Sequence, residues 1–196
     1  MASLFLVLLP ASGADAAPMA SSAGSANPVT AYVVNNYSGT VTPIRTATDT
    51  ARTAITVGTN PDAIAITPDG KTAYVTNSGS GTVTPIRTAT NTAGTPITVG
   101  SGPDAIAITP DGKTAYVVNE GSDTGTVTPI RTATNTAGTP ITVGSGPFAI
   151  GITPDGKTAY VTNDASGTVT PIRTATGTAG TPITVGSNPV AIAIAP

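Results

Sequence analysis

Residues 61–100 read PDAIAITPDGKTAYVTNSGSGTVTPIRTATNTAGTPITVG, and nearly the same segments return along the rest of the chain. The tyrosine of this stretch marks the period, because its equivalents are spaced 42, 42 and 44 residues apart. They are Tyr32, Tyr74, Tyr116 and Tyr160. A fixed period of this length is typical of a protein built from adjoining copies of one supersecondary unit.

Each unit contains four short runs that favour β-strands. In one repeat the runs are Ala63–Thr67, Ala73–Thr76, Thr82–Arg87 and Pro96–Val99. Pro-Asp-Gly between the first two runs is a tight hairpin signal, and segments rich in Asn and Gly separate the others. The pattern predicts an all-β fold, a β-propeller of about four four-stranded blades. A β-solenoid is the weaker alternative, because its coils would repeat at a shorter period.

Residue size and proline predict the strand order within a blade. The alternating Ala and Ile of the first run suit the crowded axis, so this run is expected to be innermost. Pro96 places the fourth run at the outer edge, where a missing N–H is tolerated. Pro85 lies inside the third run, where it predicts a lost ladder hydrogen bond or a bulge.

Tyr74–Asn77 and Tyr160–Asn163 spell Tyr-Val-Thr-Asn, and Tyr32–Asn35 and Tyr116–Asn119 are close variants with Val in the third place. With the in-phase Pro-Asp-Gly-Lys turns, the chain from about residue 30 onward resembles the YVTN-type β-propeller repeat proteins. The resemblance implies a bacterial or archaeal secreted or surface-layer-like protein, usually with around seven blades and often of unknown function. This chain departs from that pattern because it holds only about four units.

The residues before the repeats look like a targeting segment. Leu4–Leu9 is a short apolar run and Ala14-Asp15-Ala16 fits a cleavage site, so we expect a signal peptide over residues 1–16 and a flexible lead-in over 17–29. The signal is atypical because no Lys or Arg precedes the run, which is also too short to span a bilayer. We predict a secreted or cell-surface protein with no membrane span. The repeat units are expected at about 30–71, 72–113, 114–157 and 158–196.

The two ends of the repeat array differ in phase. The array begins at the second run, with Ala31-Tyr32-Val33, and ends on an isolated first run, Ala191–Ile194. The terminal run could complete the first blade and close the ring within one chain, and we rank this arrangement first. The alternatives are an open arc that forms a homodimer and a fragment of a longer propeller with no independent activity.

Missing residue types restrict the chemistry. The chain has no Cys and no His, and Glu120 is its one Glu. These absences exclude disulfides, thiolate metal sites and Ser-His-Asp catalysis. A net charge of −2, with 9% charged residues, is unlike the basic footprint of a nucleic-acid binder. We therefore predict a non-enzymatic protein with no catalytic residues, no metal site and no cofactor, whose partner is an unknown protein or a cell-envelope polymer.

Alternating strand direction sorts the turns onto two rims of the propeller. The turns between second and third runs share one rim with the turns that enter each first run, and most of the sequence variation falls there. This varied rim carries five acidic residues and no Lys or Arg. The weak candidate binding residues on it are Asp62, Asp104, Glu120, Asp123, Phe148 and Asp164.

The opposite, constant rim carries all eight Lys and Arg residues against four Asp. We hypothesise that the varied rim favours a cationic partner or a loosely held divalent cation, and the constant rim an anionic envelope polymer. Neutral drift and ordinary solvated charge are the simpler explanations. A propeller-type hydrolase or lactonase is the remaining alternative, and it would need several acidic or amide residues to converge at the ring mouth. Its only candidates are Asp62, Asp104, Asn60 and Asn188.

Overall fold

The computed structural model describes residues 29–121 and 124–195, which form four antiparallel sheets. The first blade holds β1 (Thr30–Asn35), the 3-10 turn η1 (Asn36–Ser38), β2 (Thr40–Arg45), β3 (Thr50–Ala51) and β4 (Ile55–Thr56). The second holds β5 (Pro61–Ile66), β6 (Thr72–Asn77), β7 (Thr82–Arg87), β8 (Thr92–Ala93) and β9 (Ile97–Thr98). The third holds β10 (Pro103–Ile108), β11 (Thr114–Asn119), β12 (Thr126–Arg131), β13 (Thr136–Ala137) and β14 (Ile141–Thr142). The fourth holds β15 (Pro147–Ile152), β16 (Thr158–Asn163), β17 (Thr168–Arg173), β18 (Thr178–Ala179) and β19 (Ile183–Thr184). The predicted all-β propeller of about four blades is confirmed.

The outer strand of each blade is split in two. In the second blade β5 pairs with β6 and β6 with β7, while β8 and β9 pair separately with opposite ends of β7. The carbonyl of Pro85 accepts a hydrogen bond of 2.7 Å from Gly94 N–H, so its ring nitrogen, which has no proton to donate, faces the same neighbour. The disruption expected at Pro85 is confirmed. The expected single fourth strand over Pro96–Val99 is wrong. The outer strand consists of β8 and β9, which are separated opposite Pro85.

The core lies between blades. One apolar cluster joins Val41 and Ile55 of the first blade to Ala73, Val75 and Ile86 of the second. Equivalent positions form the clusters between the second and third blades and between the third and fourth. An inner blade therefore buries both of its faces, and its stability depends on having a neighbour on each side.

The asparagine that ends the signature segment connects a blade to the loop that enters it. The buried Asn77 side chain donates its Nδ2 hydrogens to Oγ1 of Thr82 at 3.1 Å and of Thr84 at 3.0 Å. Its Oδ1 accepts the Gly58 N–H at 3.0 Å. A Cβ atom on Gly58 would lie 2.6 Å from Asn77 Cγ, so the loop needs glycine for this close approach.

The signature tyrosine connects each blade to the next. Tyr74 Oη donates to Asn135 Oδ1 at 2.6 Å, in a turn of the third blade, and Tyr32 makes the equivalent bond to Asn91 at 2.7 Å. Tyr74 also donates to the carbonyl of Thr132 at 3.3 Å, and Tyr116 keeps only the equivalent bond, to the carbonyl of Thr174 at 3.2 Å, because Gly177 stands where the asparagine would be. The tyrosine thus fills the core and fixes how neighbouring blades meet.

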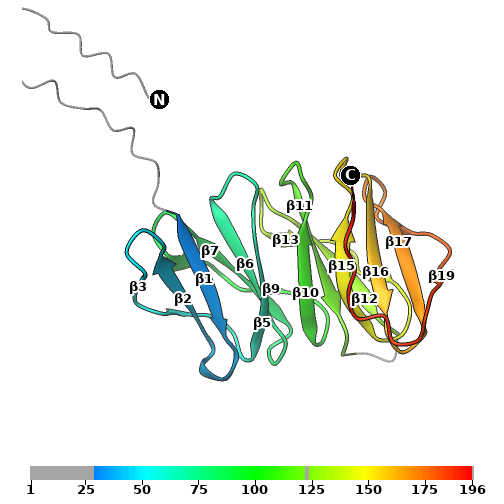
Figure 1. The fold of residues 1–196 in the computed structure, drawn as a ribbon, viewed down its shortest axis with the longest axis horizontal. Helices are drawn as coiled ribbons and strands as arrows, with labels where there is room; N and C mark the ends of the chain where they lie inside the picture. Colours follow the sequence, from blue (N-terminus) through cyan, green and yellow to red (C-terminus); the bar gives the residue numbers. More distant parts are fainter. Residues whose placement is uncertain (1–28, 122–123, 196) are drawn as a thin grey trace, which may run out of the picture.

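The four blades form an open arc (Figure 1), with β1 at one end and the C-terminal segment beside the fourth blade at the other. Within the described residues β1 pairs only with β2. The terminal run 191–194 packs on β15, where Ile192 and Ile194 lie against Gly151. The structure therefore corrects the closed ring that we ranked first, because the terminal run is held at the end of the arc that is remote from β1. Both remaining alternatives, the homodimer and the fragment of a longer propeller, are compatible with an open arc.

The expected signal peptide over residues 1–16, and all but the last residue of the lead-in 17–29, lie outside the described residues. Within the part of the chain that the structure describes, no helix has the length and hydropathy needed to cross a membrane.

The Asn77→Ala variant is expected to lower the free energy of unfolding by about 2 kcal/mol, because it leaves the Gly58 N–H and the Thr84 hydroxyl without their partner. Urea unfolding measures this loss. Asn35→Ala is the matched control, since Asn35 donates to Thr40 and Thr42 in the half-exposed end blade but receives no hydrogen bond from a described preceding loop. Equal losses in the two variants would contradict the role assigned to the loop contact.

Candidate functional site

The two kinds of turn assigned to the varied rim contact one another. In the second, third and fourth blades, the turn after the signature asparagine donates a backbone N–H to the loop that enters the same blade. These bonds are Ser78 to Asn60 at 2.9 Å, Glu120 to Gly102 at 2.9 Å and Asp164 to Gly146 at 2.7 Å. The predicted sorting of these turns onto one rim is therefore confirmed.

A β-bulge at the start of each inner strand frees one or two residues from the ladder on this rim. The register shifts between Pro61 and Ile64 in β5, between Pro103 and Ala105 in β10, and between Pro147 and Ile150 in β15. The residues inside these shifts include three of the candidates, Asp62, Asp104 and Phe148. Bulges re-aim side chains in this way beside functional sites in many proteins.

The third residue of the Tyr-Val-Thr-Asn signature determines how many residues the bulge contains. The Thr76 hydroxyl accepts the freed Ala63 N–H at 2.9 Å, and Thr162 accepts that of Ala149 at 3.0 Å. In the third blade Val118 stands in this place and pairs directly with Ala105, so the bulge shortens to Asp104 alone. Sequence reasoning missed this effect, although the exchange of Thr for Val in the signature was its visible signal.

Three of the candidate carboxyl groups interact on the varied rim. The pKa of Asp104 is raised to about 7, first by burial, then by a hydrogen bond to Glu120, and then by the charges of Glu120 and Asp62. The Asp62 carboxylate also accepts a hydrogen bond of 2.6 Å from Asn36 Nδ2. The three acidic residues therefore concentrate negative charge where the second and third blades meet.

The remaining candidates are Phe148, Asp164 and Asp123. Phe148, at the position equivalent to Asp104 on the adjacent strand β15, is 42% exposed. Asp164 belongs to the fourth blade, where its side chain lies directly over Gly146. Asp123 lies outside the described residues. Within residues 29–121 and 124–195, no group of three or more acidic side chains is placed to hold a metal ion.

The four residues named for a hydrolase do not form one cluster. Asn60 adopts a left-handed turn conformation, with φ 47°, and its Nδ2 lies 3.4 Å from Asn36 Oδ1. Asn188, with φ 55°, belongs to the segment after the fourth blade. Asp62 and Asp104 interact, and Asn60 lies in the loop that enters the second blade, whereas Asn188 follows the fourth blade.

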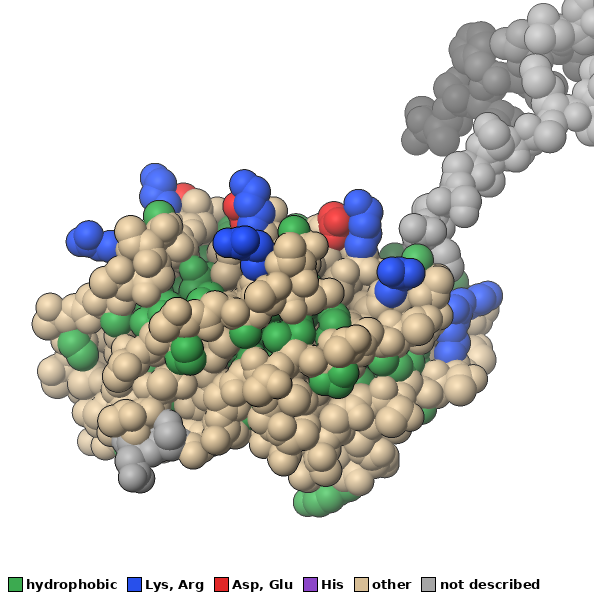
Figure 2. Space-filling model, turned by 180° about the vertical axis from the view of Figure 1, so that it is seen from behind, with side chains coloured by type: hydrophobic (Ala, Val, Ile, Leu, Met, Phe, Trp, Pro, Cys, Tyr) green, Lys and Arg blue, Asp and Glu red, His purple; other side chains and the backbone are tan. Residues whose placement is uncertain are grey.

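The constant rim carries the basic side chains, which Figure 2 shows gathered along one edge of the molecule. Three of them pair with the turn aspartates. The pairs are Lys71–Asp69 at 3.2 Å, Lys113–Asp111 at 3.4 Å and Lys157–Asp155 at 3.4 Å. All are well exposed, so their energetic contribution is small.

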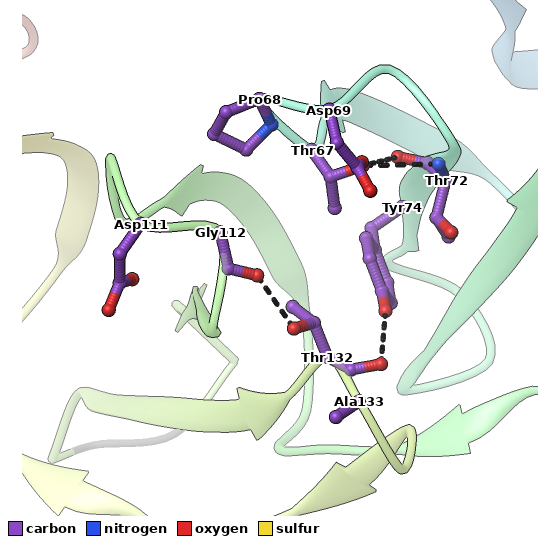
Figure 3. Close-up of a pocket in the computed structure, with 9 residues that line it drawn as sticks. All are labelled: Thr67, Pro68, Asp69, Thr72, Tyr74, Asp111, Gly112, Thr132 and Ala133. Carbon is purple, nitrogen blue, oxygen red and sulfur yellow. Dashed lines mark hydrogen bonds between the residues drawn. The ribbon is translucent and has the colours of Figure 1, made fainter.

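A pocket of about 480 Å³ opens between blades on the constant rim (Figure 3). Asp69 on its wall accepts hydrogen bonds from the Thr67 hydroxyl at 2.7 Å and the Lys71 N–H at 3.1 Å, and the bond from Thr67 is the main cause that lowers its pKa to about 2. The Thr132 hydroxyl across the pocket donates to the Gly112 carbonyl at 2.6 Å. These polar groups stabilise turns and blade contacts, as expected for Asp beside Gly in a hairpin.

Residues 1–113 match the family described as YNCE-like beta-propeller, which is more than half of the 196 residues. The chain belongs to the YNCE-like β-propeller family. Among solved structures, this propeller is similar to the hydrazine synthase of Kuenenia stuttgartiensis, with 31% identity and a TM-score of 0.77 over 81% of this chain and 47% of that one. It therefore spans about half the length of that structure.

A functionally unknown protein from Desulfotomaculum acetoxidans DSM 771 shares the fold of this YNCE-like propeller. The match has 18% identity and a TM-score of 0.57 over 82% of this chain and 67% of that one. Among curated proteins there is no significant match.

The pH dependence of stability tests the acidic group. Because the folded-state pKa of Asp104, about 7, lies above the ordinary value of 3.8, its contribution to stability is present at low pH and lost as pH rises through about 7. We expect the Tm of the native chain to fall between about pH 4 and pH 8 by a few degrees more than that of Asp104→Asn. Asp164→Asn is the control on the same rim. Parallel melting profiles for the native chain and Asp104→Asn would refute the proposed carboxyl interaction.

Proposed function

We propose that this chain is a non-enzymatic, secreted or cell-surface propeller that acts as a binding or structural module, with the varied rim as its recognition surface. The observation that carries the proposal is the position of the exposed aromatic side chains. Tyr37 is fully exposed and Phe148 is 42% exposed, whereas the other described aromatic residues are buried or half-buried. Both lie on the rim that carries the interacting carboxyl groups.

The arrangement of aromatic and acidic side chains along this rim is typical of a recognition surface. Tyr37 follows Asn36, whose side chain donates to Asp62, and Phe148 is the second residue of β15, the strand next to that of Asp104. The acidic group is therefore flanked by an aromatic side chain on each side. Exposed aromatic residues are enriched in protein interfaces, where they supply much of the binding energy.

The electrostatics favour a partner that brings positive charge. The raised pKa of Asp104 reflects burial and like-charge repulsion from Glu120 and Asp62, which a cationic group would relieve. We therefore propose that the varied rim binds a basic segment of a partner protein. The Lys and Arg residues of the constant rim would at the same time favour an anionic cell-envelope polymer.

We do not propose the activity of the similar hydrazine synthase for this chain. It covers 47% of that protein, and this chain has no Cys or His to serve as nucleophile, imidazole base or soft metal ligand. The open arc further favours association with a second copy of the chain.

Binding of a fluorescent oligolysine peptide tests the recognition surface. We expect salt-sensitive binding that weakens about tenfold in the Asp62→Asn/Asp104→Asn double variant, equivalent to roughly 1.4 kcal/mol. Lys157→Gln, on the constant rim, is the matched control and should bind at least as well as the native chain. Equal binding by the native chain and the double variant, or binding that high salt leaves unchanged, would contradict the proposal.

Export is tested separately by expressing the chain in a bacterial host and determining the N-terminus of the product by mass spectrometry. We expect protein in the envelope or medium that begins after the expected cleavage site at residue 16. Uncleaved chain confined to the cytosol would overturn the proposed localisation.

A further inference from the structure

Among the described residues, the two ends of the arc carry strand edges with no partner strand. Strands β6, β11 and β16 each pair on both sides, whereas β1 pairs only with β2 among the described residues. At the other end residues 189–194, Pro-Val-Ala-Ile-Ala-Ile, repeat the pattern of the inner strand β5. No backbone hydrogen bond joins this segment to another described residue. The described residues therefore present two segments that match the two strands of an inner strand pair.

The exposed end faces are the two halves of a blade–blade contact. Val33 on the first blade is 44% exposed, while its equivalents Val75, Val117 and Val161 are fully buried against the preceding blade. Ile183 on the fourth blade is 48% exposed, while its equivalents are at most 8% exposed because the following blade covers them. These equivalents are Ile55, Ile97 and Ile141. The fourth blade thus presents the face that a following blade covers, and the first blade presents the covering face.

Polar groups at the ends are complementary in the same way. Tyr160 forms no hydrogen bond with a described residue, whereas the equivalent Tyr32 and Tyr74 donate to Asn91 and Asn135 of the following blade. In the first blade the position of those asparagines is occupied by Asp49, which has φ 49° where Asn91 has 54°. Asp49 therefore places a carboxylate acceptor where the hydroxyl of a preceding tyrosine would arrive.

A glycine and an asparagine form a second complementary pair. The glycines equivalent to Gly186 pack against signature asparagines, and a Cβ atom on Gly100 would lie 2.7 Å from Asn119 Cγ. A Cβ atom on Gly186 would meet nothing within 4 Å. The counterpart of Asn119 in the first blade is Asn35, which no described preceding loop covers. The unfilled space at one end matches the uncovered side chain at the other.

We propose that two copies of this chain pair head to tail, with residues 189–194 of each copy completing the first blade of the other. The pairing of β10 with β11 gives the register, because Pro103 lies opposite Asn119 and Ile106 opposite Val117. The equivalent partners between copies are Pro189 with Asn35 and Ile192 with Val33. Adding a strand to an open sheet edge supplies main-chain hydrogen bonds and removes an exposed edge.

A second copy, rather than the same chain, is the occupant of β1. Ile192 and Ile194 lie against Gly151 of the fourth blade, as Ile106 and Ile108 of β10 pack on the preceding blade. This packing holds the terminal segment at the end of the arc opposite β1 (Figure 1). A head-to-tail contact is heterologous, and in the proposed pair the two contacts join both sets of four blades in one ring.

Cysteine cross-linking tests the register directly, because the chain contains no native Cys. The Val33→Cys/Ile192→Cys variant, treated with a short thiol-reactive cross-linker, is expected to run as two chains on a denaturing gel. Val33→Cys/Ala193→Cys is the matched control, because neighbouring residues of a strand point to opposite faces, and it should cross-link several-fold less. A product with the mass of one chain, no product, or equal yields from both variants would overturn the proposal.

Solution mass gives an independent test. Light scattering of the native chain is expected to give twice the mass of one chain. Val33→Lys should give a folded monomer, because Val33 is already 44% exposed within one chain, and Tyr37→Lys, on the varied rim, should leave the pair intact. A monomeric native chain, or a Val33→Lys variant that remains paired, would contradict the inference. Oligolysine binding by the Val33→Lys monomer should persist, which separates this test from that of the proposed function.

Discussion

The packing of one blade face on the next is the contact on which the rest of this structure depends. Each blade is a thin sheet with apolar side chains on both sides, so it has no interior of its own. Val75 and Ile86 of the second blade reach full burial only because Val41 and Ile55 of the first lie against them. The signature tyrosine and asparagine add hydrogen bonds across the same boundaries, to the following blade and to the entering loop.

This constraint explains why the chain can vary in some places and not in others. Residues that form the blade contacts recur with little change in every unit, while the turns of the varied rim contribute little to those contacts. That rim can therefore hold carboxyl groups such as Asp104, whose raised pKa shows an unfavourable environment for its charge, without disturbing the blades. The strict repeat supplies stability, and the varied rim is free to serve recognition.

The sequence predicted what depends on local pattern. The 42-residue period, the hairpin at Pro68-Asp69-Gly70 and the interruption caused by Pro85 each follow from a few neighbouring residues. The bulge that differs between Thr76 and Val118 was missed, because it depends on which atom meets a freed N–H across the sheet. The closed ring was wrongly ranked first, because the repeat period carries no information about the angle between neighbouring blades. Only the structure shows that residues 191–194 lie on the fourth blade. For the candidate site, the shared rim was predictable, but the interaction of Asp104 with Glu120 required the fold.

The dependence of each blade on a neighbour is tested most directly by hydrogen exchange at several protein concentrations. The amides of β1 and of residues 189–194 should become protected together as concentration rises, because each supplies the partner that the other lacks. The amides of β6 and β11 should stay equally protected throughout, since their neighbours belong to the same chain. Protection of β1 that equals that of β6 at every concentration, or a terminal segment that never becomes protected, would contradict this account.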